Sequence, residues 1–437
     1  MEERDAVLCS GSGLIVDMCE DVRGKRLAVI GGNIIMEEVC RFAKRNDLTV
    51  VSFAASKASV VHKYSDEQCY VDCSDPLTMI SLLKEKKIDA IVAISGEKMQ
   101  RRIVDWIFQS GYRFYATKEQ WAVLMDKQHF KQYAVQFGIP AIPEYTLVTD
   151  HHEVQTRFPF SVVIKPTDNS GSSGVSICRQ NSDLTAAYAD ALRYASNGKA
   201  ICEKYLQGHY FQFEIWNQNG KSFFPYTKER IYYPPIGQHP PQPFLDIYPS
   251  ADSELISGSL YHKVERMFQS LGIRNGSCMF QGIIDHDTPY IMDTAFRISG
   301  GLDYKVIREE KGIDLVGAHI QYALTGQFGD DFSMLDRPYE YIYANLCLGL
   351  KDGIISRIDG LDAVRRSCGV FAVHQNYHVG DIIHAGTFSQ IGMHVFIKAK
   401  TRSLLMRYVK EVLQKVRIEN DKGASMLLPF PDSPTYS

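Results

Sequence analysis

The chain has 437 residues, of which 45% are apolar and 23% charged, so its composition is that of a globular protein rather than a disordered one. Its 48 basic and 51 acidic side chains leave a net charge of −3, and no basic excess indicates a nucleic-acid partner. At roughly 150 residues per domain, the length predicts about three domains. No stretch reaches the roughly 18 apolar residues that a membrane-spanning helix needs. We therefore expect a cytoplasmic protein with no membrane or nucleic-acid partner.

Ten cysteines are scattered along the chain, and no two of them form a C-x-x-C pair. Cys69 and Cys73 are the closest pair, and no second pair with metal-ligand spacing follows them. Thiols without a pairing pattern are typical of a reducing compartment. We predict free thiols and no zinc site.

Strand and helix signals alternate over residues 25–117. Three short apolar runs have the composition of buried strands: 25–32, 48–55 and 88–95. Each is followed by a segment with helical spacing: 34–46, 76–87 and 101–111. This alternation predicts a parallel α/β sheet. The first run ends in two glycines, which we interpret as a turn because the full G-x-G-x-x-G pattern of dinucleotide-binding proteins is absent.

The segment 117–140 predicts a helix with marked ends. Thr117 and Gln120 have the spacing of a capping box, and Gly138 followed by Pro140 marks the stop. Beyond it we expect a strand, a glycine-serine turn and a strand within 160–178. An amphipathic helix and two further strands then follow, at 182–196, 199–208 and 210–216.

Residues 225–249 contain seven prolines and several aromatic side chains. Because proline interrupts regular structure, we predict an ordered loop or flap over a site instead of a central strand. We expect this segment to select the substrate, with polar contacts from Tyr226, Arg230, Tyr232, Tyr233 and Gln238.

The remaining chain predicts a helix over 259–272 and two consecutive strands in SCMFQGIID and YIMDTAF. After about residue 331 the pattern is one of short strands, glycine turns and a final helix at 402–416. No internal repeat is present.

The turn within 160–178 is the first candidate site. It reads DNSGSSG from Asp168 to Gly174, and it supplies backbone N–H groups, hydroxyls and glycines that let a phosphate approach closely. Lys165 lies just before this turn, on the same strand face as Val163. A lone lysine in an apolar strand is costly to bury without a partner, and a phosphate would be such a partner. Lys127 is a second cation; without these lysines the turn would be an ordinary hairpin.

The second candidate site is the strand pair near 281–297. Gln281 and Asp293 are 12 residues apart across a turn, so they could face each other on paired strands. A carboxylate with neighbouring oxygen ligands can hold Mg²⁺ together with phosphates. Arg297 could stabilise charge on a transferred phosphoryl group. Taken alone, the segment is also consistent with a hairpin that carries a surface salt bridge.

In order and spacing, these segments resemble the ATP-grasp superfamily of carboxylate–amine ligases. The matching motifs are MDKQHFKQYAVQFGIPAIP, VVIKPTDNSGSSGVSI, ICEKYLQG and IMDTAFRISGG. The GIDL and ALTGQ stretch resembles the closing part of ligases related to the carbamoyl-phosphate synthetase large chain and biotin carboxylase, although no biotin-attachment sequence is present.

The resemblance implies a fold of class α/β and α+β. A Rossmann-like parallel α/β domain would precede the ATP-grasp domain, and a mixed α+β region would follow it. The expected boundaries are 1–117, 118–330 and 331–437, with a nucleotide-binding hairpin subdomain at about 140–205.

The resemblance also implies roles in nucleotide binding. Lys127 and Lys165 would contact the ATP phosphates, and Lys228 would be a further phosphate or substrate contact. The loop would cover the phosphates through Ser170, Gly171, Ser172, Ser173 and Gly174. Adenine would be contacted by Glu203, Lys204 and Leu206.

For catalysis and metal binding, the resemblance implies Arg297 and Lys165 at the reacting groups, and Mg²⁺ at Gln281 and Asp293. Four positions depart from the family pattern. Asp293 is followed by Thr294 where the family has Glu then Asn, Gln281 replaces a carboxylate, and Tyr210 replaces a ribose-binding acid. We therefore predict weaker Mg²⁺ binding or fewer bound ions.

The implied function is an ATP- and Mg²⁺-dependent, ADP-forming ligase. It would activate a carboxylate of an amino acid, peptide or sugar acid as an acyl phosphate and condense it with an amine. Its partners would be these small molecules, with a homodimer as one candidate assembly. Two alternatives stay open: a nucleotide-binding pseudo-enzyme or regulatory protein of the same fold, and a bicarbonate-using, ATP-dependent carboxylase.

Overall fold

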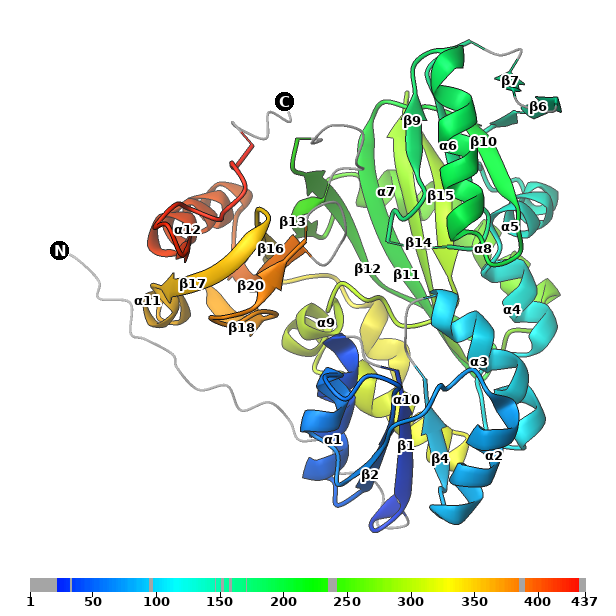
Figure 1. Ribbon diagram of the computed structural model, residues 1–437, viewed down its shortest axis with the longest axis vertical. Helices are drawn as coiled ribbons and strands as arrows, with labels where there is room; N and C mark the ends of the chain where they lie inside the picture. The colour runs from blue at the N-terminus through cyan, green and yellow to red at the C-terminus, as the bar shows by residue number, and fades with distance from the viewer. Residues whose placement is uncertain are drawn as a thin grey trace.

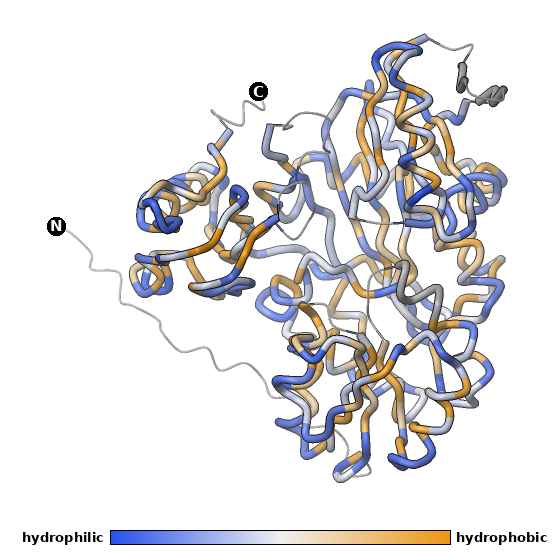
Figure 2. Tube along the Cα trace, in the orientation of Figure 1, coloured by the Kyte–Doolittle hydropathy of each residue, from blue (hydrophilic) through white to orange (hydrophobic). Residues whose placement is uncertain are grey.

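The computed structural model describes residues 22–31, 34–93, 97–145, 147–150, 153–156, 159–169, 171–234, 242–384 and 390–431 (Figure 1). Within these ranges the strands form two four-stranded sheets, one eight-stranded sheet and two smaller sheets. Figure 2 shows that hydrophobic residues gather along the central strands, many of which are buried in the cores. None of the described helices is both long and apolar enough to cross a bilayer.

The first four-stranded sheet is parallel, as predicted. Its order is β3-β2-β1-β4, and its strands are β1 (Arg26–Ile30), β2 (Thr49–Phe53), β3 (Glu67–Cys69) and β4 (Ala90–Val92). The segments between them include α1 (Ile34–Arg45), η2 (Val60–Lys63) and α2 (Pro76–Glu85), and α3 (Glu97–Ser110) follows β4. The strands are almost wholly buried, which explains their continuous apolar runs.

The predicted helix at 117–140 is divided into α4 (Lys118–Leu124), α5 (Lys127–Ala134) and the short η3 (Val135–Phe137). The capping box of Thr117 and Gln120 is present at the start of α4, and Gly138 ends the run in the left-handed conformation. The division occurs because the Asp126 carboxylate accepts two backbone N–H groups and starts a second helix. Lys127 is therefore the first residue of α5.

The second four-stranded sheet is antiparallel and has the order β5-β10-β8-β9. Its strands are β5 (Glu144–Tyr145), β8 (Val162–Pro166), β9 (Ser176–Cys178) and β10 (Ala200–Lys204). Helix α6 (Asn181–Tyr194) packs on it through Leu184, Ala187 and Ala191. The two-stranded sheet β6 (Leu147–Asp150) and β7 (Glu153–Thr156) adjoins α6.

The eight-stranded sheet has the order β15-β14-β11-β12-β13-β16-β20-β18. Its first five strands in this order are β15 (Thr288–Ala295), β14 (Gly276–Asp285), β11 (His209–Gln218), β12 (Lys221–Tyr232) and β13 (Pro243–Tyr248). Its remaining strands are β16 (Ile342–Gly349), β20 (Ile391–Ala399) and β18 (Val370–Gln375). The sheet thus runs from the predicted metal strands into the C-terminal region.

The prediction that 225–249 is a loop was wrong for most of that segment. Residues 225–232 belong to β12 and residues 243–248 to β13, and both strands are interior to the eight-stranded sheet. Pro225 is tolerated because it lies where the register between β11 and β12 shifts, and Pro243 is the first residue of β13. Residues 235–241, with Gln238, lie outside the described ranges.

The helices around the large sheet are α7 (Ser253–Ile256), the π-turn η4 (Ser257–Tyr261), α8 (His262–Ser270), α9 (Tyr304–Lys311), α10 (Leu315–Thr325) and η5 (Phe332–Asp336). The C-terminal region adds α11 (Leu361–Arg365), α12 (Arg402–Lys415) and a small sheet of β19 (Ile382–Ile383), β17 (Gly353–Asp359) and β21 (Arg417–Asn420). In Figure 1 this region, coloured orange and red, lies at one end of the large sheet, whose last strands β20 and β18 belong to it.

Helices α9 and α10 share one hydrophobic core with α1 and the first sheet. Their closeness is clear at Gly317 of α10, where an added Cβ atom would lie 2.5 Å from the ring of Phe42 on α1. Segments 212 residues or more apart in sequence (304 − 92 = 212) therefore form a single core. The domain boundaries at 117 and 330 stay predictions.

Candidate active site

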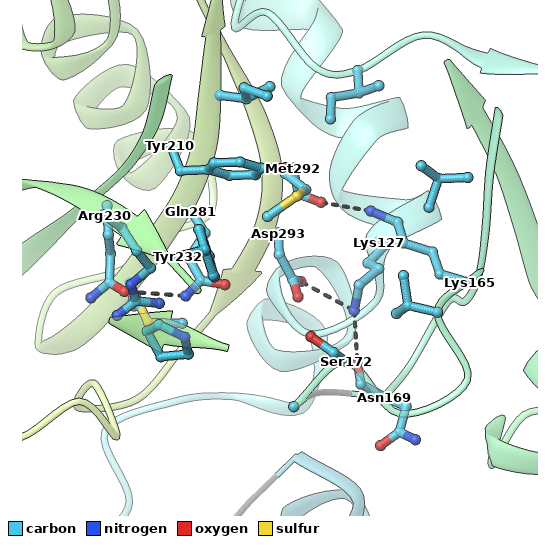
Figure 3. A pocket seen from close by; sticks show the side chains of 18 of the residues that line it. Lys127, Lys165, Asn169, Ser172, Tyr210, Arg230, Tyr232, Gln281, Met292 and Asp293 are labelled. Carbon is cyan, nitrogen blue, oxygen red and sulfur yellow. Dashed lines mark hydrogen bonds and ion pairs between the residues drawn. The ribbon is translucent and has the colours of Figure 1, made fainter. Parts of the chain in front are cut away.

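A cavity of about 410 Å³ lies between the four-stranded antiparallel sheet β5-β10-β8-β9 (the small antiparallel sheet) and the eight-stranded sheet. Most of the predicted site residues line it: Lys127, Lys165, Gly171, Ser172, Glu203, Lys204, Leu206, Tyr210, Gln281, Asp293 and Arg297. Figure 3 shows Lys127 and Lys165 on one side, and Arg230 and Tyr232 on the other, with Gln281 and Asp293 between them. The cavity therefore has one wall from each sheet.

The two predicted phosphate-binding lysines are both buried and both paired. Lys127 Nζ donates to the backbone oxygen of Asn169 at 2.7 Å and lies 3.2 Å from a carboxylate oxygen of Asp293. Lys165 Nζ lies 2.6 Å from Glu203 and donates to the backbone oxygen of Met292 at 3.1 Å. Burial, together with nearby Lys131 and Lys127, holds the pKa of Lys165 well below its ordinary value.

A third lysine, Lys131, completes this cluster and was missed in the sequence. It lies one helical turn after Lys127, on the same side of α5, and its ammonium contacts Glu203 and the backbone oxygen of Ile142. Burial lowers the pKa of Lys131 to about 8. The Glu203 carboxylate thus contacts two buried ammonium groups at once. The i, i+4 spacing of Lys127 and Lys131 was the signal available beforehand.

The glycine-rich loop joins β8 to β9 as predicted. Gly171 and Ser172 line the cavity, Ser173 and Gly174 do not, and Ser170 lies outside the described ranges. Gly174 has φ +75°, and an added Cβ atom there would lie 3.0 Å from Tyr194. The base of the loop is fixed by Asp168, whose carboxylate accepts the backbone N–H groups of Ser196 and Asn197.

One end of the cavity is apolar. Ile142, Leu206 and Ile283 form a buried cluster there, with Met292 and Tyr210 packed against it. Further apolar cavity walls come from Val163 and Ile177 of the small sheet. A slot with apolar sides beside the end of β10, where Glu203, Lys204 and Leu206 line the cavity, suits a flat ring such as a nucleobase.

The predicted metal strands meet as expected. Gln281 of β14 and Asp293 of β15 are direct cross-strand partners, so their side chains share one face of the sheet. Gln281 Nε2 donates to Gln212 Oε1 at 3.2 Å, which leaves Oε1 of Gln281 on the side that faces Asp293 (Figure 3). Among the described residues, no three His, Cys, Asp or Glu side chains form a metal-binding group.

The oxygen donors of Asp293 and Gln281 fit one Mg²⁺ ion that is also bound by the phosphates of a nucleotide. Such an ion takes one or two carboxylates and completes its shell with phosphate oxygens and water. Asp293 can supply the carboxylate and Gln281 an amide oxygen. Because Lys127 is 3.2 Å from Asp293, a cation that binds there has to share this carboxylate with an ammonium group.

Arg297 lies at the end of β15 and lines the cavity beside Ser299, Gly300 and Gly301. Its Nη1 donates to the backbone oxygen of Ile298 at 2.9 Å. The backbone N–H of Ser299 donates to Glu214 at 3.2 Å. Burial, with a contribution from Asp303, raises the pKa of Glu214 to about 8, so this side chain is mainly protonated at neutral pH.

Lys228, predicted as a phosphate or substrate contact, lies beneath the cavity wall. It is fully buried, and its ammonium is 2.6 Å from Asp303 and 2.8 Å from Asp246. It is not among the residues that line the cavity. Four residues of the predicted substrate segment do line it: Arg230, Tyr232, Gln242 and Pro243.

The other residues expected to contact substrate are elsewhere. The hydroxyls of Tyr226 and Tyr233 bond to Asp303 and to the backbone of Cys347, and both side chains are buried.

The cysteines in the described part of the chain form no disulfide, as predicted. Seven of these eight thiols are buried, and Cys368 is exposed.

Comparison with known proteins bears directly on the segment that carries Lys127, Lys165 and the glycine-rich loop. Residues 126–215 match the family model for the ATP-binding domain of the carbamoyl-phosphate synthase L chain. A curated relative, an uncharacterized protein of Sinorhizobium fredii, is 22% identical over 299 residues, which is 65% of this chain and 59% of that protein. The similarity thus spans less than two thirds of the relative's length.

Solved structures share the fold over nearly the whole chain. The L-amino acid ligase of Bacillus licheniformis has a TM-score of 0.74 at 18% identity, with 91% of this chain and 99% of that chain covered. The biotin carboxylase domain of Hydrogenobacter thermophilus 2-oxoglutarate carboxylase, in complex with MgADP, ADP and bicarbonate, has a TM-score of 0.69 at 17% identity over 92% and 91%.

The family match over residues 126–215 and the shared fold agree with the predicted resemblance to ATP-grasp ligases. The predicted fold class is confirmed.

Proposed function

We propose that this chain is an ATP-dependent, ADP-forming ligase that activates a carboxylate as an acyl phosphate and joins it to an amine. One observation carries the proposal. A single cavity brings Lys127, Lys165 and the glycine-rich loop together with Asp293 and Arg297. Phosphoryl transfer needs such cations and backbone donors around the phosphates, because its catalysis is mostly positioning and charge neutralisation.

In the proposed complex, ATP lies between the two sheets. Its adenine occupies the apolar slot of Ile142, Leu206 and Ile283, next to the backbone of Glu203 and Lys204. Its phosphates lie beside Lys127 and Lys165, beneath Gly171 and Ser172. Asp293 and Gln281 hold Mg²⁺, which neutralises phosphate charge when it is bound.

The chemistry follows from the poor leaving ability of hydroxide, which prevents a carboxylate and an amine from condensing directly in water. A carboxylate oxygen attacks the γ-phosphorus, a new O–P bond forms, and ADP leaves as the bond to the β–γ bridging oxygen breaks. The amine nitrogen then attacks the acyl carbon, loses a proton and expels inorganic phosphate. Arg297 stabilises the negative charge of the acyl phosphate, and the cavity walls keep water away from it.

The similarity to an L-amino acid ligase supports amino acids as the first substrates to test. The second solved structure carries bicarbonate, which supports bicarbonate as an alternative carboxylate. Peptides and sugar acids complete the set of candidates. We also propose a cytoplasmic location, since the described thiols form no disulfide, and we retain a homodimer as the candidate assembly.

The test uses purified protein with ATP, Mg²⁺ and pooled amino acids, peptides and sugar acids, with mass spectrometry of the products. We expect ADP together with a product lighter than its two parents by one water. AMP in place of ADP would contradict the acyl-phosphate route. ATP binding without turnover, with bicarbonate as well as with the pool, would favour the pseudo-enzyme. Bicarbonate-dependent ADP release would favour the carboxylase.

A further inference from the structure

An arginine lines the cavity on the side away from the lysine cluster. Arg230 is on β12, and the order β15-β14-β11-β12 separates it by two strands from the strand of Asp293. Figure 3 shows Arg230 and Tyr232 opposite Lys127 and Lys165. The cavity therefore has an arginine on its second wall, and the proposed phosphate contacts do not use it.

A chain of buried charges holds Arg230 in one orientation. Its Nε and Nη2 atoms donate to the two oxygens of Asp246 at 2.7 and 3.0 Å. Asp246 also accepts from Lys228 at 2.8 Å, and Lys228 lies 2.6 Å from Asp303. The side chains of Asp246, Lys228 and Asp303 are at most 1% exposed. This two-point bond to a buried carboxylate fixes the plane of the guanidinium group.

Asp246 stays ionised in this setting. Burial acts to raise the pKa of Asp246, but Arg230 and Lys228 lower it well below its ordinary value. The charges of Arg230 and Lys228 therefore balance those of Asp246 and Asp303. This cluster needs no ligand to be stable.

The guanidinium group of Arg230 has donors beyond those that Asp246 takes. Arginine has five N–H donors; two of them bond to Asp246, and the Tyr232 side chain is a further hydrogen-bond partner. A planar fork of N–H groups matches the two oxygens of a carboxylate. A phosphate monoester carries up to two charges and would meet a single cation on this wall, so a carboxylate is the better fit.

We propose that Arg230 binds a carboxylate that does not react, carried by the amine substrate, and that Asp246 is its positioning residue. This inference rests on the proposed ligase function. The reacting carboxylate has to meet the γ-phosphate beside Lys127 and Arg297, so the amine has to approach from the other side, where Arg230 lies. The amine is then an amino acid or peptide with a free carboxylate, and the product keeps that carboxylate.

The test supplies each L-amino acid as the amine substrate and, separately, the carboxamide of the same amino acid. Both are combined with the same set of carboxylate substrates. We expect the wild-type protein to form dipeptides and to use the carboxamides at least tenfold less efficiently. Arg230→Gln should lower kcat/KM for the free acids by about tenfold to hundredfold, the usual value of a charge-assisted hydrogen bond. It should leave the carboxamide rate and the KM for ATP unchanged.

Further variants separate recognition from folding. Arg230→Lys keeps the charge but loses the planar pair of N–H donors. Its preference for free amino acids over their carboxamides should therefore be smaller than that of the wild type. The double variant Arg230→Gln with Asp246→Asn leaves no unpaired buried carboxylate. It should lose the preference for free acids over carboxamides to the same extent as Arg230→Gln alone. Arg407→Gln, on the exposed side of α12, is the control and should keep the preference.

A binding measurement keeps the inference independent of turnover. With a non-hydrolysable ATP analogue and Mg²⁺ present, calorimetry should show free amino acids binding at least tenfold more tightly than their carboxamides, and Arg230→Gln should abolish this difference. No ADP with any pair would contradict the proposed function, and the binding difference would still support the carboxylate subsite.

Other results would overturn the subsite. Equal use and binding of acids and amides by the wild type would do so, as would a preference for phosphoethanolamine. The subsite would also be overturned if Arg230→Gln kept the preference for free acids over carboxamides. The same holds if the KM of Arg230→Gln for ATP rose as much as its kcat/KM for free acids fell.

Discussion

The ammonium group of Lys165 lies 2.6 Å from a carboxylate oxygen of Glu203, so the lysine proposed to bind phosphate is paired with an acid on the adjacent strand. Strands β8 and β10 are direct neighbours, and Glu203 also contacts Lys131 from α5. One carboxylate therefore pairs with two buried cations, of which Lys165 lines the cavity. The arrangement presents positive charge to a ligand at a defined place.

Replacing Lys165 should remove this charge without removing the strand. We expect Lys165→Met to lower ADP release by at least about a hundredfold, because removing one preorganised charged donor from a phosphoryl-transfer site costs on that order. The melting temperature should change little, since methionine fills a similar volume. ADP release and thermal unfolding measure the two effects. Lys410→Met, at an exposed position of α12, is the control, and unchanged ADP release in Lys165→Met would disprove the phosphate contact.

Glu203→Gln should destabilise the protein strongly. Removing this carboxylate leaves Lys131 and Lys165 without their shared partner, and breaking a buried ion pair from one side costs about 3–5 kcal/mol. The loss should shrink above pH 8, because the pKa of Lys131 is about 8 and its ammonium then releases its proton. Urea denaturation at pH 7 and pH 9 gives both values.

The control for this experiment is the exposed ion pair of Arg357 and Asp359, whose side chains are 64% and 39% exposed. Asp359→Asn should change the free energy of unfolding by no more than about 0.5 kcal/mol. A loss of that small size in Glu203→Gln would show that Glu203 does not balance the two lysines.

The metal requirement should respond in opposite directions to two substitutions. Asp293→Asn removes the carboxylate of the proposed Mg²⁺ site, so the Mg²⁺ concentration for half-maximal ADP release should rise at least tenfold. Gln281→Glu adds a carboxylate directly across the strand pair and should lower that concentration. Mg²⁺ titration of ADP release, with Mn²⁺ binding followed by electron paramagnetic resonance, provides the measurement. The same Mg²⁺ curve in all three proteins would mean that the ion is held elsewhere.

Glu214 should make stability depend on pH between about 4.5 and 8. Burial raises the pKa of Glu214 to about 8, so the folded protein retains a proton that the unfolded chain releases. Stability from this group is therefore present at low pH and is lost as the pH rises toward 8. Glu214→Gln stays neutral, so its melting temperature relative to the wild type should increase from pH 5 to pH 8.5. Glu254→Gln on α7 controls for the loss of one acid, and a constant difference for Glu214→Gln would contradict the protonated state.

Local patterns predicted much of the nucleotide side of the cavity. The spacing of Gln281 and Asp293 predicted their cross-strand pairing, and the alternation of β8 predicted that Val163 and Lys165 face the same way. These features depend on neighbours close in sequence. The parallel first sheet was also predictable, because its buried strands leave continuous apolar runs.

The substrate side was not predictable in the same way. Strand β12 is interior because β11 and β13 cover its two edges, and β13 in turn pairs with β16 about 100 residues later. Seven prolines dominate the local signal, while the register shift that accommodates Pro225 exists only in the folded sheet. The Arg230–Asp246 pair depends on these pairings, so it emerges only from the structure.

The strands that carry Asp293, Gln281, Arg230 and Asp246 all belong to one hydrogen-bonded sheet, whereas Lys165 and the glycine-rich loop belong to another. The separation between the proposed metal residues and the proposed substrate residues is therefore set by inter-strand spacing within this one sheet. Exchange of side chains on β12 or β13 can then alter the proposed substrate wall while the proposed metal residues on β14 and β15 keep their geometry. This division makes the large sheet a frame on which new specificities can evolve one strand at a time.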